Sequence, residues 1–572
     1  MRNLELAALF YKIADILEMQ SVKWKPQAYR RAAQSLEALE RDIEELWKEG
    51  KLKEIPGVGE GIARHIDEFL RTGKVRPFEA IMRKIPKGLG ELMEIESIGP
   101  KKAFFLYKRL KIKNLADLEA AVKRHKLENL PGFGEKSEQN ILKGIGMYKS
   151  GHERMLLGNA LSIAEGIVAE LKKNRGIERI AIAGSLRRMK ETIGDIDILA
   201  TAENANAVMD AFVNMQEVRD VLAKGTTKTT VVLNSGVQAD VRVLKDIEFG
   251  SALQYFTGNK EHNIKLREIA IKRGLKLSEY GLFEKKTGRR IAGKTEEEIY
   301  AKFGMKYIEP ELREDRGELQ AAMQGKLPKI IGYGSAKGDF HVHSNWSEGS
   351  EGIEEIANAA KNIGYEWICL TDHSKSERIA HGLDEERLLK QIAEIRKINK
   401  KMKPFRILAG SEVDIKANGE LDFSNDVLKR LDVVVAAVHS GFKSTRGQMT
   451  ARVLDGINNR HVRIIAHPTG RLIGKREGYE IDLERIFEAC AKRGVMPEIN
   501  AYPERTDLND ANAKRAIELG CKIAIGTDAH SIGQLHYMRL GIAMARRAWA
   551  EEKDIANTLN LGRIEKLFRL RE

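Results

Sequence analysis

The sequence predicts a multidomain α and α/β protein, in which helical domains come first and a (β/α)7 barrel comes last. Three observations lead to this fold class. At 572 residues the chain is too long for a single hydrophobic core. Apolar residues such as Leu9, Ile13 and Leu17 recur at helical spacing within the first 150 residues. After residue 337, seven apolar strand candidates alternate with helical runs, as in a (β/α) barrel.

Charge and composition narrow the class of protein. Lys and Arg number 97 and Asp and Glu 83, and the net charge of +14 favours a polyanionic partner. A hydrophobic fraction of 42% with only 12 prolines excludes wholesale disorder. Three scattered cysteines exclude a disulfide framework and suit a reducing cytosol. Because no apolar stretch approaches roughly 18 residues and the chain starts without a signal-peptide core, we expect a cytoplasmic protein with no membrane partner.

A glycine-containing pattern occurs three times in the N-terminal third, at 52–63, 92–103 and 127–138. Each copy predicts a helix, a hairpin in which Gly permits a positive φ, and a second helix whose exposed amides can hold a DNA phosphate. An ordinary helix–helix turn is the alternative for any one copy. The three copies resemble helix-hairpin-helix DNA-binding motifs. That resemblance implies these DNA-contacting residues: Gly57, Gly59, Gly99, Lys101, Gly132, Gly134 and Lys136.

Three aspartates in the middle of the chain form a candidate metal site. Asp195 and Asp197 lie two apart in an alternating run, so they share one strand face while Ile196 and Ile198 enter the core. Asp240 lies in a second alternating run. Carboxylates converging from neighbouring strands would hold two hard divalent cations for phosphoryl transfer. Solvated acids at strand ends are the alternative interpretation.

The Gly184-Ser185 turn, ten residues before Asp-x-Asp, resembles the nucleotidyltransferase palm. The segment Tyr255-Phe-Thr-Gly258, followed by Asn263 and Arg267, narrows the resemblance to family X DNA polymerases. This resemblance implies that Mg²⁺ or Mn²⁺ is bound by Asp195, Asp197 and Asp240, with Arg242 as the ion-pairing neighbour of Asp240.

The same resemblance assigns the nucleotide contacts. It implies that Gly184, Ser185 and Arg188 hold the triphosphate of a dNTP, which suits a backbone turn and a guanidinium. Tyr255 and Phe256 would then restrict the sugar 2′ position. The other implied contacts come from Gly258, from Asn263 to the base and from Arg267 to the template. Lys260 departs from the family, which often has an acid there.

The resemblance extends to the N-terminus, where the family carries a helical lyase domain. His65 and Gly61 stand where lyase-competent members place lysines. An imidazole cannot form the imine that an amine forms with an aldehyde. We therefore expect this domain to bind the downstream end of a gap without that chemistry.

Histidines concentrate in the C-terminal part, where nine of the 13 lie from His341 onward. Most follow apolar strand candidates, and a His-x-His pair places two imidazoles on one strand face. Any single histidine could be a packed or solvated residue. The whole pattern resembles the PHP (polymerase and histidinol phosphatase) domain. The nine metal-ligand positions implied by that resemblance are His341, His343, Glu348, His373, Glu412, His439, His467, Asp528 and His530.

Mixed imidazole and carboxylate ligation suits Mn²⁺, Zn²⁺ or Fe²⁺, and the resemblance implies up to three ions and phosphodiester hydrolysis. Glu348 stands where family members commonly have Asp or His. His381, His461 and His536 lie outside the pattern and are expected at the surface.

Composition and motifs together give the expected domain boundaries. These are a lyase-like helix-hairpin-helix domain (1–80), a second helix-hairpin-helix domain (81–150), the palm (151–245), a nucleotide-selecting subdomain (246–315), a polar linker (316–337) and the PHP domain (338–572).

The leading hypothesis is a monomeric family X DNA polymerase that fills short gaps in gapped or primed DNA during repair, joined to a PHP 3′-5′ exonuclease. A second hypothesis makes the PHP centre dominant, as an AP endonuclease or phosphoesterase brought to DNA by a polymerase-like platform. A third is a non-catalytic DNA-binding scaffold. The complete carboxylate and ligand sets disfavour the scaffold, because it needs no charge cluster that costs stability.

Overall fold

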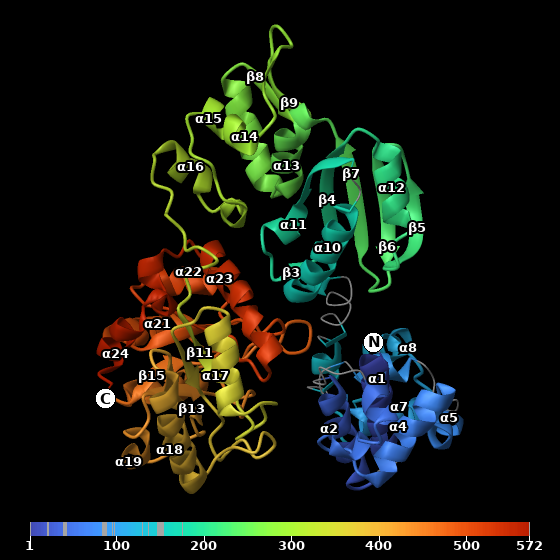
Figure 1. The fold of residues 1–572 in the computed structure, drawn as a ribbon, viewed down its shortest axis with the longest axis vertical. Helices are drawn as coiled ribbons and strands as arrows, with labels where there is room; N and C mark the ends of the chain where they lie inside the picture. The colour runs from blue at the N-terminus through green and yellow to red at the C-terminus, as the bar shows by residue number, and fades with distance from the viewer. Residues whose placement is uncertain are drawn as a thin grey trace. The chain divides into compact units, whose positions relative to one another are not determined.

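The computed structural model of the chain forms two compact units, a helical one before residue 153 and an α/β one after it (Figure 1). Among the helices that it describes, none has the length and apolar character needed to cross a membrane. The described residues are 2–19, 22–37, 43–82, 88–93, 95, 98–128, 130–134, 137–142, 144–145, 154–173 and 176–570.

The helical unit contains two hydrophobic cores. The first lies among the helices before residue 80, where Phe10, Ile13 and Leu36 are fully buried. The second gathers Leu92, Leu106 and later residues. The elements are α1 (Arg2–Met19), α2 (Lys25–Glu37), α3 (Ile43–Lys48), η1 (Leu52–Glu54), α4 (Glu60–Thr72), α5 (Arg76–Met82), α6 (Leu89–Met93), α7 (Pro100–Leu110) and α8 (Leu115–Lys123).

The three glycine-containing repeats fold alike within the described residues. In each hairpin, a backbone amide donates to a carbonyl three residues earlier, from Val58 to Ile55 in the first copy, from Ile98 to Ile95 in the second and from Phe133 to Leu130 in the third. In each copy, the carbonyl of a glycine accepts the first backbone hydrogen bond of the following helix. These glycines are Gly59, Gly99 and Gly134. Gly57 and Gly132 have φ of +77° and +82°, which explains why the first and third hairpins have glycine at this position.

The α/β unit begins with a five-stranded sheet in the order β2-β4-β7-β6-β5. Only β4 and β7 pair in parallel. The side chains of Ile196 and Ile198 on β4 enter the core beneath α10 and α12, whereas Leu199 packs with α13 on the opposite face. The elements are β1 (Met155–Leu156), α10 (Leu157–Leu171), β2 (Ile177–Ile182), α11 (Gly184–Arg187), β3 (Thr192–Ile193), β4 (Asp195–Ala202), α12 (Ala205–Val213), β5 (Val218–Lys224), β6 (Lys228–Leu233) and β7 (Gln238–Leu244).

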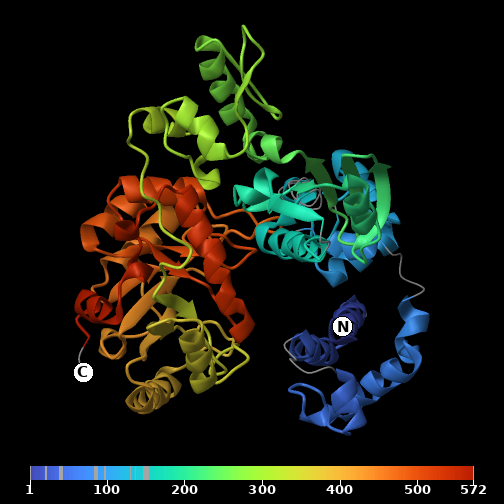
Figure 2. The same cartoon turned by 45° about the horizontal axis from the view of Figure 1, so that its top comes forward.

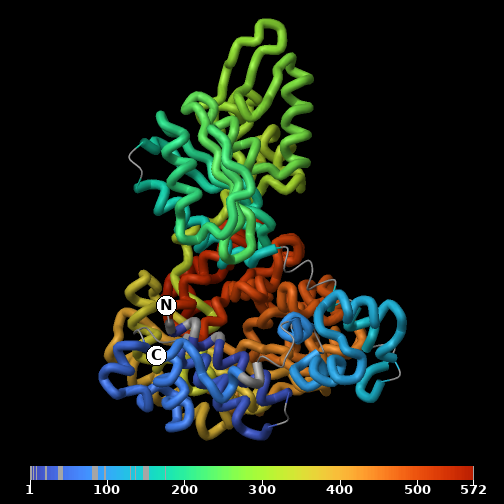
Figure 3. Tube along the Cα trace, turned by 90° about the vertical axis from the view of Figure 1, so that its right-hand side faces the viewer, coloured from blue at the N-terminus to red at the C-terminus, as the bar shows by residue number. Residues whose placement is uncertain are grey.

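A smaller subdomain follows the sheet. Its hydrophobic core includes Leu266, Ile299 and Tyr300. The hairpin of β8 and β9 projects from the end of this subdomain (Figure 3). Its elements are η2 (Asp246–Glu248), α13 (Phe249–Thr257), α14 (Lys260–Lys272), β8 (Leu275–Ser278), β9 (Gly281–Glu284), β10 (Arg290–Ala292), α15 (Glu296–Lys302), η3 (Pro310–Leu312) and α16 (Glu318–Met323).

The C-terminal part contains seven parallel strands in sequential order, and this confirms the predicted (β/α)7 barrel. A bridge between Val342 and Ala529 brings the last strand beside the first. Trp367 and Cys369 point into the barrel, and Ile368 and Leu370 point toward the surrounding helices. Figure 2 shows helices around the barrel strands. The strands are β11 (Gly338–Val342), β12 (Trp367–Leu370), β13 (Arg406–Asp414), β14 (Val433–Ala437), β15 (Val462–Ile465), β16 (Met496–Asn500) and β17 (Ala524–Gly526).

Helices cover the outside of the barrel, and one closes its end. Ile564 and Phe568 of the last helix fill the end at which the strands begin, and Phe568 meets the ring of Phe340 with centroids 5.9 Å apart. The helices are α17 (Ile353–Asn362), α18 (Glu385–Met402), α19 (Asn425–Leu428), α20 (Arg446–Asn458), α21 (Leu483–Arg493), α22 (Asp510–Glu518), η4 (Ile532–Tyr537), α23 (Met538–Arg547), η5 (Glu552–Asp554), η6 (Ala556–Thr558) and α24 (Leu561–Phe568).

Residues 316–337 pack closely against the elements on either side. Leu319 and Ala322 of α16 join the core of the preceding subdomain. Just before this segment, Glu311 accepts a hydrogen bond of 2.7 Å from Arg546 of α23 and another of 2.7 Å from the Tyr333 hydroxyl. The segment that was predicted as a polar linker is therefore ordered and tied to the barrel.

A carboxylate at position 314 joins the sheet to the barrel. Glu314 lies 2.9 Å from Arg188, after α11, and 3.0 Å from Arg547 of α23. Arg547, whose side chain is 1% exposed, also binds Asp510 at 2.6 Å. Burial alone would raise the pKa of Glu314, but Arg547 and Arg188 lower it to about 2.

The buried ion pairs of Glu296 should stabilise the subdomain in a pH-dependent way. Its carboxylate binds Arg313 and Arg187, each at 2.6 Å, and these charges outweigh burial and lower its pKa to about 2. A lowered pKa adds stability above the unfolded value near 4.5, and that stability is lost as the pH falls toward 2. Glu296→Gln should cost about 3 kcal/mol locally.

Hydrogen exchange of peptides covering α15, measured from pH 6 down to pH 3, would test this prediction. The variant should lose protection at pH 6 and show a flatter pH dependence than the wild type. Glu297→Gln, an exposed change on the same helix, is the control. Equal protection of α15 in the Glu296 variant and the wild type would contradict the prediction.

Candidate active sites

The parallel pairing of β4 with β7 brings the sheet aspartates together. Asp197 lies opposite Asp240 in the register, and Asp195 begins β4 on the same face. Gly184 of the neighbouring turn has φ of +65°, and a Cβ there would lie 2.6 Å from a carboxylate oxygen of Asp197. The turn therefore approaches the aspartates closely only because this residue has no side chain.

The three aspartates repel one another, and a lysine offsets part of this charge. Burial, with the charges of Asp195 and Asp240, raises the pKa of Asp197 to about 6. Lys228 of β6 lies 2.7 Å from Asp240. The prediction that Arg242 forms an ion pair with Asp240 is wrong, because Lys228 takes that place. The Arg242 guanidinium instead lies 4.5 Å from the centre of the Phe256 ring. In the antiparallel register Lys228 lies opposite Arg242 and Thr230 lies opposite Asp240, so Lys228 is the diagonal neighbour of Asp240, and its ammonium reaches the carboxylate from there.

A carboxylate oxygen without a hydrogen-bond partner at this place fits a divalent cation. The Oδ1 atom of Asp240 is buried and has no hydrogen-bond partner. The oxygens of the three carboxylates are farther apart than the possible ligand atoms of the barrel clusters described below, because they do not all come within 4.8 Å of one another. The sheet thus positions the aspartates as neighbours, and Lys228 holds one oxygen of Asp240.

The predicted nucleotide contacts lie on the α11 turn and along the segment from α13 to α14. Arg188 donates to Glu314 and to the carbonyl of Thr257. The Asn263 amide donates to the carbonyl of Tyr255 at 2.7 Å and accepts from Gln254, also at 2.7 Å. Of the remaining predicted contacts, Ser185 lies in α11, Phe256 in α13 and Arg267 in α14, and Gly258 lies between α13 and α14.

The nine candidate ligands of the barrel form one connected cluster at the ends of the strands. Glu412, which is 1% exposed, lies 2.8 Å from His467, 3.0 Å from His373 and 3.1 Å from His439. The remaining contacts complete the cluster: His341–Glu412 at 3.3 Å, His343–Asp528 at 3.2 Å, Glu348–His373 at 3.1 Å and Glu348–His530 at 3.0 Å.

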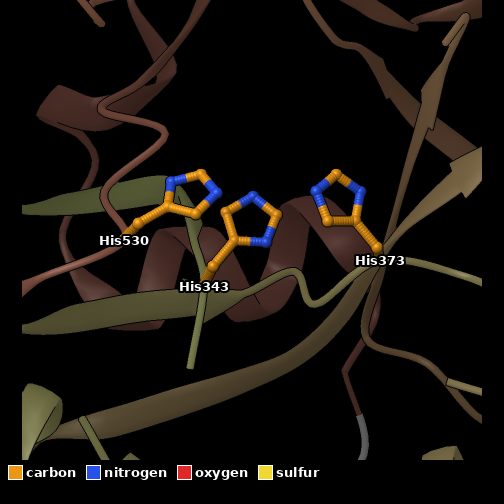
Figure 4. Close-up of side chains that lie close together, drawn as sticks. All are labelled: His343, His373 and His530. Atoms are coloured by element: carbon orange, nitrogen blue, oxygen red, sulfur yellow. The ribbon is translucent and has the colours of Figure 1, made fainter. Parts of the chain in front are cut away.

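The imidazoles lie in contact with one another. His343 is stacked between His373 and His530, with ring centroids at 4.6 and 4.3 Å (Figure 4). Burial, with the charges of His530 and His373, lowers the pKa of His343 to about 3. For His439, burial is outweighed by Glu412 and Asp414, which raise the pKa to about 10.

This donor set fits metal cations. The Nδ1 atoms of His343 and His467 are buried without a hydrogen-bond partner, and Nε2 of His341 faces Nε2 of His343 at 3.1 Å. Groups of possible ligand atoms within 4.8 Å of one another include His343–His373–His530, His341–His343–Asp528 and His373–Glu412–His439. Facing nitrogen lone pairs beside carboxylates are what borderline divalent metals bind.

Two carboxylates behind the cluster were not predicted as site residues. Glu498 accepts from Nδ1 of His341 at 2.8 Å and from the amide of His467 at 2.7 Å. Asp414 lies 3.1 Å from Nδ1 of His439. Such carboxylates fix the orientation of a ligating imidazole. The alternation in Glu412-Val-Asp414 was the sequence signal for one of them, and the strand-end position of Glu498 was the signal for the other.

His65 is packed as a structural residue. Its Nδ1 lies 2.6 Å from the Tyr29 hydroxyl, and its ring contacts Phe78 edge-on with centroids 5.4 Å apart. Burial, together with the positive charges of Arg64 and Lys25, lowers its pKa. Lys25 is thus an amine near His65 that the sequence did not indicate.

The predicted DNA-contacting residues lie on the hairpins. Gly59 and Gly99 precede α4 and α7 in extended conformation. Glu60, the first residue of α4, is exposed, and α7 begins with Pro100, which has no amide hydrogen. Lys101 is exposed in the first turn of α7. Lys136 lies outside the described residues.

Fold and sites together define a nucleotidyl-transfer palm joined to a metal-binding barrel, with helical hairpins before both. Sequence profiles agree with this class. They match a helix-hairpin-helix domain at residues 1–75, a SAM-like helix-hairpin-helix tandem at 89–146, a DNA polymerase beta thumb at 252–314 and a PHP domain at 339–502.

Relatives extend the comparison to the whole chain. A DNA polymerase/3′-5′ exonuclease PolX of Bacillus subtilis is 37% identical over 572 residues, which is all of both chains. A probable phosphatase of Thermoanaerobacter is 29% identical over 243 residues, covering 40% of this chain and 94% of the relative. The chain belongs to the PolX type of the family X DNA polymerases, with a C-terminal PHP domain.

Glu498→Gln should weaken metal binding to the barrel. The change removes the carboxylate that orients His341, and loss of such a partner typically weakens metal affinity about 10- to 100-fold. Titration calorimetry with Mn²⁺, together with the bound metal per chain, would measure it. Glu488→Gln, on the exposed side of α21, is the control. Unchanged Mn²⁺ affinity in the Glu498 variant would contradict this role.

Proposed function

We propose that this protein is a DNA-directed DNA polymerase and 3′-5′ exonuclease that fills short gaps in DNA during repair. The full-length similarity to a relative named for both activities carries the proposal. The two separate clusters of candidate ligands in the α/β unit support it, because each suits a different phosphodiester reaction. The polar, basic chain and its helical hairpins suit a DNA substrate.

In the palm, Asp195, Asp197 and Asp240 would hold Mg²⁺ or Mn²⁺. Such ions, when bound, stabilise the attacking and leaving oxygens of nucleotidyl transfer. Asp240 lies beside Lys228, whose charge limits repulsion within the site. The paired register of the strands keeps the carboxylates in place before substrate arrives.

The dNTP would be held by residues around this centre. Gly184, Ser185 and Arg188 would bind its triphosphate, and Arg188 would exchange Glu314 for phosphate oxygens. Tyr255 and Phe256 would crowd a 2′-hydroxyl. The remaining proposed contacts are Gly258 beside the sugar, Asn263 at the base and Arg267 at the template.

In the barrel, the nine candidate ligands would hold up to three Mn²⁺, Zn²⁺ or Fe²⁺ ions. Such ions, when bound, supply Lewis-acid activation for phosphodiester hydrolysis. Glu498 and Asp414 orient His341 and His439, and Arg505 lies 3.1 Å from Asp528, where its charge would favour an anionic substrate. These residues would trim 3′ ends.

The hairpins would position the DNA for both centres. Backbone amides near Gly59, Gly99 and Gly134, with Lys101 and Lys136, would contact phosphates without reading bases. The lyase-like helices before residue 80 would bind the downstream end of a gap. We propose a cytoplasmic monomer whose substrates are gapped or primed DNA and dNTPs.

A second candidate function gives the barrel the leading role. The similarity to a probable phosphatase covers 40% of this chain and 94% of that relative's length. The protein would then be an AP endonuclease or phosphoesterase with a polymerase-like platform. Nucleotide addition by the purified chain separates the two candidates.

Asp240→Asn should abolish nucleotide addition and spare 3′ trimming. The loss of one carboxylate removes a proposed metal ligand and several kcal/mol of transition-state stabilisation, which corresponds to a fall of roughly a thousandfold. Primer extension on gapped DNA with Mg²⁺ measures this rate. Asp220→Asn, on the exposed edge strand β5, should extend normally. Extension by the Asp240 variant near the wild-type rate would refute the palm assignment.

His341→Ala should have the opposite effect. It removes a fully buried imidazole from the barrel cluster, so degradation of a labelled single-stranded 3′ end should be lost while gap filling continues. His381→Ala, an exposed residue outside the cluster, is the control. Retained trimming in the His341 variant would place the exonuclease elsewhere in the chain.

Covalent trapping of 5′-deoxyribose-phosphate DNA with borohydride should give little adduct. His65 cannot form an imine, and exposed amines are mostly protonated at neutral pH. Lys25 and Lys74 are exposed amines in this domain. Strong trapping that is lost in Lys25→Ala or Lys74→Ala would show that a displaced lysine has taken the role.

A further inference from the structure

A large hollow lies at the end of the barrel opposite the candidate metal ligands. Its volume is about 1170 Å³, and it borders the starts of β13, β14 and β15, together with α18 and α24. The candidate ligands Glu412, His439 and His467 stand at or beyond the other ends of the same strands. The hollow is therefore separate from the proposed exonuclease centre.

The wall of this hollow is strongly basic. It contains eight lysines or arginines and two acids, whereas the whole chain has 97 basic and 83 acidic residues. The eight are Arg396, Lys400, Lys403, Arg406, Lys429, Arg430, Arg463 and Arg569. The wall of the hollow therefore has a much higher ratio of basic to acidic residues than the chain as a whole.

Both acids in the wall already have partners. Glu565 binds Arg406 at 2.5 Å. Asp432 accepts the amide of Ala409 at 3.0 Å. Burial and the nearby charge of Arg569 lower the pKa of Arg463, so like charges face one another there. This arrangement favours an anion that would neutralise the remaining cations.

Barrel stability does not account for these cations. The strand-start end is already closed by Ile564 and Phe568 of α24, and the Trp367 indole donates to the Leu559 carbonyl at 3.1 Å. Gathered cations repel one another and weaken the fold. Their position beside a hollow therefore indicates binding rather than packing.

We propose that this hollow binds the phosphate and base of a nucleotide. Cations at the rim would bind the phosphate, and the apolar part of the wall would receive the base, at Pro404, Phe405, Leu431 and Leu570. The ligand is either a free nucleoside monophosphate or the phosphorylated terminal nucleotide of a strand, which share this chemistry. The site is independent of both proposed catalytic centres.

Photo-crosslinking of the full chain with 8-azido-dAMP would test the proposal. The reaction would be run with EDTA, so that neither proposed centre can use divalent metals. Mass spectrometry would then locate the modified peptides. Adducts are expected within 395–406, 428–432 or 561–570, and Asp240→Asn and His341→Ala should leave them unchanged.

Charge variants of α18 and of Lys403, which directly follows it, provide the matched comparison. Lys400→Gln/Lys403→Gln removes two cations of the wall, and labelling should fall about tenfold or more. Lys397→Gln/Lys401→Gln removes two exposed cations of α18 that do not line the hollow, and labelling should persist. Adducts found only in the palm or beside the metal-ligand cluster, or equal losses in both variants, would overturn the proposal.

Competition identifies the source of the nucleotide. If dAMP reduces photo-labelling of the hollow more strongly, the ligand is a free nucleotide. If a 5′-phosphorylated oligonucleotide reduces it more strongly, the ligand is a strand end. Equal protection by inorganic phosphate at the same concentration would overturn the assignment of a nucleotide site.

Discussion

Parallel pairing between neighbouring strands is the constraint on which both candidate sites depend. In the palm sheet it sets Asp197 opposite Asp240, although other elements separate them in the sequence. In the barrel all seven strands run the same way, so the side chains that follow them meet around Glu412. Antiparallel pairing of the same strands would carry these residues to opposite edges.

Concentrated charge is the consequence of this convergence, and particular neighbours offset it. Lys228 binds Asp240 in the palm, and imidazoles surround Glu412 in the barrel. Although burial would raise the pKa of Glu412, those imidazoles hold it well below its ordinary value. The charge that makes each site suitable for divalent cations is thus balanced within the folded chain itself.

Ion pairs also connect the palm to the barrel within the α/β unit. Glu314 binds Arg188, which follows the turn beside the palm aspartates, and Arg547 of the barrel helix α23. Arg188 is also a proposed contact of the triphosphate, so nucleotide binding would compete with Glu314. The two proposed reactions are chemically separate, but the turn beside the palm aspartates and helix α23 of the barrel share a buried carboxylate.

The sequence by itself determined the features that are local. Glycines marked the hairpins, alternation placed Asp195 and Asp197 on one face, and residues at strand ends marked the barrel cluster. Only the tertiary structure decided which distant groups meet. It paired Asp240 with Lys228, placed Glu498 behind His341 and packed residues 316–337 against both neighbours. Local spacing fixes the direction of a side chain along its own element, whereas its partners come from other elements that only packing brings into contact.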